Sequence, residues 1–218
     1  DKKARPVMVW LHGGGFTTGN GSSQAYDGVR LAKRGDVVVV TVNHRLNAFG
    51  YLALNHYGKG FEDSAAAGLL DLVQALQWVK DNAAAFGGDA GNVTIFGESG
   101  GGAKVSTLLN TESAKGLFHR AIVQSGAVLR LPDETAARAE ADKVVEKLGL
   151  TKDTIEQIKT TAQDSSFNGV NLLNGDTLKL VFNETGKSTL SIVGVNSDPA
   201  GLGLSSLVQG TDFIDNSS

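Results

Sequence analysis

Four short apolar runs punctuate the first 126 residues, and they constrain the fold more than any other feature. Apolar and polar residues do not alternate within them, which is typical of strands buried on both faces in a parallel sheet. Each run is bounded by glycine or by polar turn residues. The runs are VMVWLHG (7–13), DVVVVTVN (36–43), NVTIFG (92–97) and HRAIVQSG (119–126).

Segments with helical spacing separate these runs. The longest is expected to begin at a cap formed by Asp63 or Ser64 and to end at Gly87. Strand–helix alternation predicts an α/β fold, a mostly parallel sheet flanked by helices, with its chemistry at the carboxyl ends of the strands. The predicted helices cover residues 26–35, 63–86 and 100–110.

Composition excludes several classes of function. The 218 residues carry a net charge of −3, which gives no electrostatic reason to expect nucleic acid or acidic membranes as partners. No apolar stretch approaches the roughly 18 residues of a membrane span. The chain contains no cysteine, so disulfides, thiol catalysis and thiolate metal sites are excluded. It opens on DKKARPVMVW, without a signal peptide, and we expect it to be part of a longer protein.

The sequence GESGGG places Ser99 between glycines at the end of the third run, where a helix is predicted to start. Small neighbours permit a sharp, strained turn that exposes the hydroxyl, and the helix N-terminus favours developing negative charge. A simple tight loop between strand and helix is the alternative. The strand before and the helix after favour a nucleophilic serine.

A glycine triplet in LHGGGF (11–16) follows the first run. Its unshielded backbone amides could bind the oxyanion of a tetrahedral intermediate, and the expected donors are Gly14 and Gly15, joined by Gly100. A flexible loop or a phosphate-binding loop would also be rich in glycine. The phosphate-loop pattern is absent, however, and Phe16 follows the triplet.

These motifs resemble the type-B carboxylesterases of the α/β-hydrolase superfamily, and the bacterial members most closely. The resemblance runs from about residue 5 to 150 through VMVWLHGGGF, VNHRLNAFGYL, DSAAAGLLDLVQALQWVKDNAAAFGGDAGNVTIFGESGGG and LFHRAIVQSG. It implies a serine esterase that acts on small carboxylic esters without a metal or organic cofactor. It also implies that Ser99 is the nucleophile, that Gly14, Gly15 and Gly100 form the oxyanion hole, and that Glu98 gives electrostatic support. The family positions matched by Asn43, Arg45, Asp71 and Trp78 are interpreted as structural.

The remaining catalytic residues are not evident. A nucleophilic serine needs a histidine base and a carboxylate that orients it, and in the family these follow in the order serine, acid, histidine. None of the four histidines follows position 119. His12 is expected to shape the glycine loop and His44 to be structural, with a role as the base as the alternative for each, and His56 is expected to be solvated. His119 is expected at the amino-terminal edge of the sheet, far from Ser99, and Asp133 is a substitute acid.

The C-terminal part differs in character. We place a domain boundary between a partial hydrolase domain, 1–155, and a segment, 156–218, that resembles bacterial flagellin in SSFNGVNLLNGDTLKLVFNETGKSTLSI. Within it, DTLKLVFN and STLSIVGV predict a β-hairpin with a polar turn at 184–187. Two functions therefore stay open: an ester hydrolase that is weak or inactive by itself because the histidine and acid are missing, or a structural or assembly protein without catalytic activity.

Overall fold

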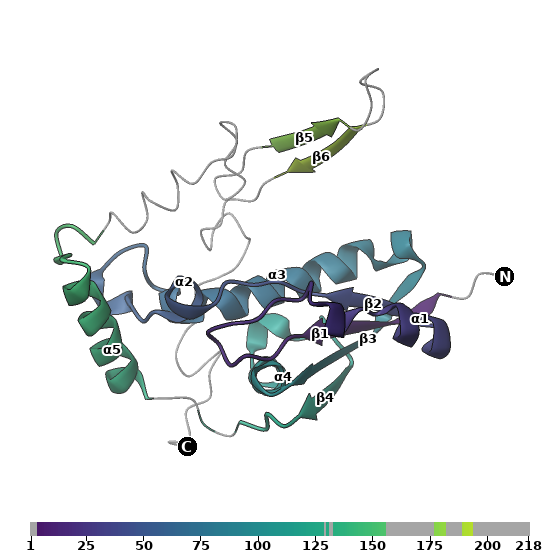
Figure 1. Ribbon diagram of the computed structural model, residues 1–218, viewed down its shortest axis with the longest axis horizontal. Helices are drawn as coiled ribbons and strands as arrows, with labels where there is room; N and C mark the ends of the chain where they lie inside the picture. Colours follow the sequence, from purple (N-terminus) through teal and green to yellow (C-terminus); the bar gives the residue numbers. More distant parts are fainter. Residues whose placement is uncertain (1–3, 129, 131–132, 156–176, 182–188, 194–218) are drawn as a thin grey trace.

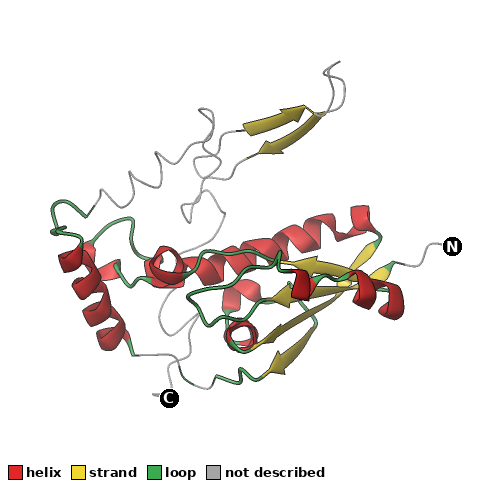
Figure 2. Ribbon diagram, in the orientation of Figure 1, coloured by secondary structure: helices red, strands yellow, loops and turns green. Residues whose placement is uncertain are grey.

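The first part of the chain alternates strands and helices, and Figures 1 and 2 show the parallel strands together with the helices that accompany them. This computed structural model describes residues 4–128, 130, 133–155, 177–181 and 189–193. The strands are β1 (Arg5–Leu11), β2 (Val38–Thr41), β3 (Gly88–Glu98), β4 (Arg120–Gln124), β5 (Thr177–Val181) and β6 (Thr189–Val193). The α-helices are α1 (Val29–Gly35), α2 (Asn47–Tyr51), α3 (Ala67–Asn82), α4 (Gly100–Leu109) and α5 (Glu134–Lys147). Short 3-10 turns are η1 (Gln24–Tyr26), η2 (Asn55–Tyr57), η3 (Ser64–Ala66), η4 (Ala83–Phe86) and η5 (Glu112–Ala114).

The main sheet has four strands in the order β2-β1-β3-β4, and every neighbouring pair is parallel. Val9 of β1 is aligned with Val40 of β2 and with Ile95 of β3. The carboxyl ends of β1 and β3 are in register too, because Leu11 pairs with Gly97. The predicted α/β fold is confirmed, and the glycine loop and Ser99 leave the sheet at the same edge.

One face of the sheet carries the main hydrophobic core. Alternate residues of β1 and β3 point to this face and are fully buried, and the apolar sides of α3 and α4 pack against them. The helical spacing predicted for the longest helix is confirmed, since it identifies the side chains that α3 buries. The core residues of these four elements are Val7, Val9, Leu11, Val93, Ile95, Leu69, Leu72, Val73, Leu76, Val79, Val105 and Leu108.

The other face is only partly covered by the described residues, which corrects the expectation that both faces are buried. Trp10 and Phe96 on this face are half-buried and contact each other edge to face, with ring centroids 4.9 Å apart. Helix α1 has only seven residues and packs near β2, where Gly28 lies against Val39. A helix of this length cannot cover four strands, and Ile122 of β4 stays 45% exposed.

The long predicted helix is divided into three consecutive pieces, η3, α3 and η4. The predicted cap position is confirmed, because Asp63 is the N-cap residue of η3, but its side chain makes no capping hydrogen bond, and the Ser64 hydroxyl accepts a hydrogen bond from the Leu54 amide. The predicted end is confirmed. Gly87 adopts a left-handed conformation, with φ 75°, and its amide bonds the carbonyls of the last turn.

A second apolar cluster lies under α5, a helix that follows β4. Ala141 and Val145 of α5 are buried against Leu54, Phe61 and Ile155. The helix therefore packs on the segment between α2 and α3, away from the main core.

The two C-terminal strands form the predicted antiparallel hairpin, with Leu178 opposite Ile192 and Leu180 opposite Leu190. The polar turn at 184–187 and the proposed boundary after residue 155 fall outside the described residues, as does most of the segment that resembles flagellin. Among the described residues, no helix is long and apolar enough to cross a bilayer.

Candidate active site

Ser99 occupies a strained turn between β3 and α4. Its backbone has φ 55° and ψ −120°, a combination that non-glycine residues rarely adopt. Two hydrogen bonds hold it there: the Ser99 amide donates to the Gln124 carbonyl at 2.9 Å, and the Ala103 amide donates to the Ser99 carbonyl at 3.0 Å. The residue itself is exposed. The turn therefore presents the serine to solvent on a rigid backbone, as the nucleophile motif predicts.

Glycines next to Ser99 allow the helix to approach the sheet closely. A Cβ atom on Gly101 would lie 1.9 Å from the Leu11 carbonyl oxygen, and one on Gly97 would lie 2.5 Å from the Gly101 carbonyl carbon. Both separations are below any real carbon contact. The sequence around Ser99 is therefore rich in glycine because β1, β3 and α4 meet there backbone to backbone.

The glycine loop, residues 12–18, is held by its carbonyl groups. Gly14 and Gly15 have φ values of 89° and 64°, which only glycine adopts easily. The Gly13 carbonyl accepts from His12 Nδ1 at 2.8 Å. The Gly14 carbonyl accepts from the amide and hydroxyl groups of Thr17 and Thr18.

The glycine loop and the serine turn touch each other. A Cβ atom on Gly13 would lie 3.6 Å from Ser99 Cβ and 3.2 Å from Glu98 Oε2. One on Gly100 would lie 2.3–2.5 Å from backbone atoms of Gly15. Within the described part of the chain, no hydrogen bond uses the amides of Gly14, Gly15 or Gly100 as donors. Three amides without a protein acceptor thus lie on the two segments that flank the exposed serine.

Two histidines stack beside the glycine loop. The rings of His12 and His44 are 5.0 Å apart and nearly parallel, and the Nε2 atom of each is buried without a described hydrogen-bond partner. Burial lowers the pKa of His44 to about 4, and the positive charge of Lys104 acts in the same direction. The pKa of His12 is lowered by burial as well. Both rings are therefore neutral near pH 7, and neither makes a described hydrogen bond to Ser99.

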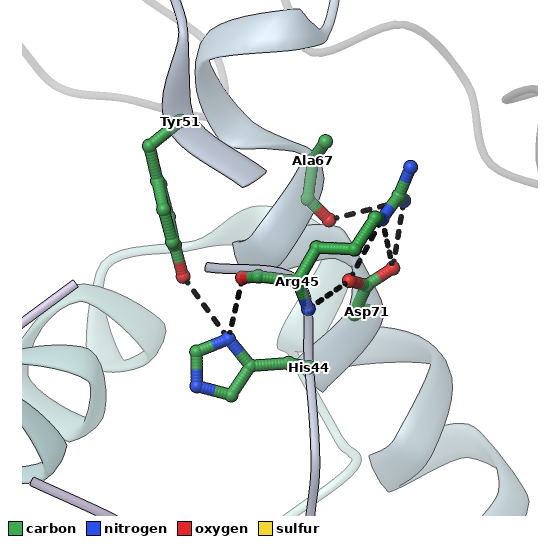
Figure 3. Close-up of polar contacts among 5 residues, drawn as sticks. All are labelled: His44, Arg45, Tyr51, Ala67 and Asp71. Carbon is green, nitrogen blue, oxygen red and sulfur yellow. Dashed lines mark hydrogen bonds and ion pairs between the residues drawn. The ribbon is translucent and has the colours of Figure 1, made fainter. Parts of the chain in front are cut away.

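Arg45 anchors the segment after β2 to helix α3. Its guanidinium makes a two-point contact with the Asp71 carboxylate, with Nη2–Oδ1 at 2.7 Å and Nε–Oδ2 at 2.9 Å (Figure 3). The Arg45 amide donates to the same carboxylate, and its carbonyl accepts from His44 Nδ1. The Tyr51 hydroxyl approaches the same Nδ1 atom of His44, at 3.4 Å (Figure 3). This network fixes the orientation of His44, which agrees with the structural interpretation of Arg45 and Asp71.

Asn43 and Trp78, the other two positions interpreted as structural, differ in how they contact the rest of the fold. The side-chain oxygen of Asn43 accepts from the Gly21 amide at 2.8 Å and so ties two loops together. Trp78 is 47% exposed and contacts Phe86, so within the described chain it lies outside the core.

The remaining candidate residues have described hydrogen-bond partners other than Ser99. His56, expected to be solvated, keeps 25% of its side-chain surface exposed, and its Nε2 lies 2.7 Å from Asp142 Oδ1 of helix α5. His119 is bound to Val93 near the amino-terminal half of β3, as expected. Asp133 caps helix α5 by accepting from the Ala136 amide at 3.0 Å. A carboxylate engaged in this way serves the helix, and nothing in its contacts supports a role as the acid.

Sequence reasoning missed one buried residue of this region, Lys104. It is completely buried, and its ammonium group donates to the carbonyls of His12 and Gly15. The sequence did contain a signal for this buried charge. Lys104 is the single charged residue of GGGAKVSTLL, a helix otherwise made of small, apolar and hydroxyl-bearing residues. No group of three or more potential metal ligands gathers anywhere in the residues that the structure describes.

Comparison with known proteins decides the family. The model of the carboxylesterase family matches residues 1–209. This chain belongs to the carboxylesterase family. Among curated relatives, it is 45% identical over 162 residues to the para-nitrobenzyl esterase of Bacillus subtilis (strain 168), covering 74% of this chain and 32% of that protein. It is 52% identical over 125 residues to liver carboxylesterase 1 of Oryctolagus cuniculus, covering 57% of this chain and 21% of that one.

Solved carboxylesterases share the fold as well. A carboxylesterase of Geobacillus stearothermophilus superposes with a TM-score of 0.70 at 48% identity, covering 72% of this chain and 33% of that one. The chain thus spans about a third or less of the length of these carboxylesterases.

Proposed function

We propose that this chain carries the nucleophile and the oxyanion hole of a serine carboxylesterase of the type-B kind. The observation that supports this most directly is the contact between the exposed, strained Ser99 and a loop whose Gly14 and Gly15 amides have no acceptor in the described part of the chain. Family membership supports ester hydrolysis as the reaction. Small carboxylic esters are the proposed substrates.

In the proposed reaction, the Ser99 oxygen attacks the acyl carbonyl carbon, and the carbonyl oxygen becomes an oxyanion. The amides of Gly14, Gly15 and Gly100 stabilise this oxyanion, at about 3 kcal/mol of barrier for each donor. Collapse of the intermediate breaks the ester C–O bond, and the alcohol leaves with the proton that the serine lost. Water then hydrolyses the acyl-enzyme by the same route. Glu98, exposed beside Ser99, is proposed to give electrostatic support to the site.

The proton transfers require a histidine and a carboxylate. The resemblance implies that these follow Ser99 in the order acid, then histidine, whereas this sequence has no histidine after position 119. We therefore expect slow turnover from the chain by itself. Enzymes of this type that lack a triad member keep roughly 10³–10⁴-fold acceleration over water from the oxyanion hole and binding.

The release of p-nitrophenolate from p-nitrophenyl acetate tests the proposal, because acylation needs only one event per molecule. The wild type should release p-nitrophenolate slowly but above the rate in buffer, and Ser99→Ala should release none above that rate. Ser125→Ala is the matched control, since Ser125 is also exposed with a positive φ, 51°, after a parallel strand. Equal release by the wild type and Ser99→Ala would contradict the proposal and favour a non-catalytic, structural role.

The flagellin resemblance of residues 156–218, and a fusion of two ancestries, stay predictions. The carboxylesterase match extends through residue 209 and so includes most of this segment. Sedimentation of the chain tests whether this segment has an assembly role. Filaments or ladders of oligomers would support that role, whereas a single small species would count against it.

A further inference from the structure

Lys104 is a fully buried cation behind the glycine loop. It belongs to helix α4, which begins directly after Ser99, and its side chain has 0% exposure. The ammonium nitrogen donates to the Gly15 carbonyl at 2.8 Å and to the His12 carbonyl at 3.1 Å. It also lies 5.3 Å from the centre of the Phe16 ring, within range of a cation–π contact.

Burying the Lys104 charge is unfavourable for the stability of the folded protein. Moving an ammonium group out of water is costly, and a carboxylate usually compensates for it. No ion pair of the described residues includes Lys104; its described partners are two carbonyl oxygens and an aromatic ring. Burial accordingly lowers the pKa of Lys104 to about 8, so the group is still largely protonated at pH 7. A methionine would fill the same space without this penalty, and perturbed ionisable groups cluster at functional sites.

The two carbonyls that Lys104 binds are the first and last of a continuous set. The carbonyls of Gly13 and Gly14, between them, accept from His12 and from Thr17 and Thr18. In a planar trans peptide, the N–H points away from the C=O of the same unit. The carbonyl of each residue and the amide of the next residue belong to one such unit. Fixing the carbonyls of residues 12–15 therefore also fixes the directions of the next residues' amides, including those of Gly14 and Gly15.

We propose that Lys104 is a positioning residue that clamps both ends of the glycine loop and so holds its amides in place beside Ser99. The inference rests on the proposed function for its catalytic consequence. The clamp starts from the helix that follows the nucleophile directly, so one element sets the spacing between the serine and the loop. The positive charge also lies behind the proposed oxyanion hole, with the sign that favours a developing anion.

The test compares Lys104→Met, which keeps the length and removes the donors and the charge, with Lys104→Gln, which keeps a donor without the charge. Lys115→Met is the matched control, because the Lys115 side chain is 77% exposed and contacts only Glu112 in the described chain. Two measurements are made on each protein. Hydrogen–deuterium exchange reports on residues 12–20, and reaction with a fluorophosphonate gives the binding constant KI and the rate constant kinact separately.

Loss of the clamp should accelerate exchange by about tenfold in Lys104→Met at the Thr17 and Thr18 amides, which bond the Gly14 carbonyl, with no change in the β3 peptides. It should lower kinact by about tenfold while KI changes little, since misplaced donors affect the transition state. Lys104→Gln should lie between the wild type and Lys104→Met, and Lys115→Met should equal the wild type.

Unchanged exchange in Lys104→Met, or faster exchange with an unchanged kinact, would overturn the inference while leaving the proposed function intact. If Lys104→Met fails to fold, Lys104→Gln decides instead. Exchange and kinact values in Lys104→Gln that equal those of the wild type would overturn the inference. Failure of the wild type to react at all would instead overturn the proposed function and the catalytic part of this inference, and the exchange data would still decide whether the clamp exists.

Discussion

Ser99 combines a strained backbone with an exposed hydroxyl, two properties that stability alone does not favour. A residue in such a conformation costs of the order of 1–3 kcal/mol and persists only where its surroundings enforce it. Here the bonds to Gln124 and Ala103 supply that enforcement. The strain is therefore a structural signature of the proposed nucleophile.

Relief of this strain should be measurable. Ser99→Gly and Ser99→Ala both remove the hydroxyl, but only glycine adopts φ 55° without penalty. We expect Ser99→Gly to exceed Ser99→Ala in free energy of unfolding by about 1 kcal/mol, measured by urea denaturation. Equal stability of the two variants would mean that the turn is not strained.

The buried histidine pair should make the protein sensitive to mild acid. The pKa of His44 is about 4 in the folded protein and 6.5 in the unfolded chain, because burial and Lys104 disfavour its charged form. Between these values the unfolded chain binds a proton that the folded protein does not, so stability falls as the pH drops below 6.5 and this contribution levels off below about 4. The lowered pKa of His12 acts in the same direction.

We expect the free energy of unfolding to decrease by about 2 kcal/mol from pH 7 to pH 5 through His44. Urea denaturation at the two pH values measures the change, and His44→Gln should show a clearly smaller decrease. A decrease of the same size in the variant would show that other groups cause the acid sensitivity.

At the scale of elements, the site depends on how closely α4 approaches the ends of β1 and β3. The absence of side chains at Gly97 and Gly101 permits this approach. The same contact places the first turn of α4 against the glycine loop, since Gly100 meets the backbone of Gly15.

Gly101→Ala should therefore separate the helix from the sheet. Its Cβ would meet the Leu11 carbonyl oxygen at 1.9 Å, and backbone atoms cannot move aside as a flexible side chain would. We expect a loss of about 3 kcal/mol in the free energy of unfolding, seen as a lower thermal midpoint. Gly35→Ala is the control: an added Cβ there makes only ordinary contacts with Val37, so its stability should stay equal or rise slightly. A wild-type midpoint in Gly101→Ala would contradict the close contact.

The sequence predicted the elements around the site well because each has a local signal. Apolar runs identified the four parallel strands, helical spacing identified the buried side of α3, and glycine marked the end of η4, the turn that follows α3. Helix α5 was not predicted, although its signal was present: Asp133 stands immediately before a run of helix-forming residues and caps it. Asp63 stands at the expected N-cap position without a side-chain capping bond, and the Ser64 hydroxyl takes part in a tertiary contact with Leu54 that no local pattern encodes.

At the scale of the whole molecule, the fold class follows from sequence pattern, and the meeting of two motifs at one sheet edge follows from the fold. LHGGGF and GESGGG are more than 80 residues apart, yet parallel pairing of β1 with β3 brings them together. Other contacts depend on long-range packing that no local pattern encodes. The link from His56 to Asp142 and the clamp by Lys104 are of this kind. The incomplete cover of the second sheet face also could not be predicted from runs that look buried on both sides.

The central proposal is that Ser99 is a nucleophile beside backbone amides that have no acceptor among the described residues. Mass spectrometry after treatment with a fluorophosphonate tests it most directly, because phosphonylation forms one Ser99–phosphorus bond, expels one fluoride and needs no turnover. The account predicts a single adduct on Ser99 in the wild type and none in Ser99→Ala. An unmodified wild-type chain, or an adduct that persists in Ser99→Ala, would contradict it.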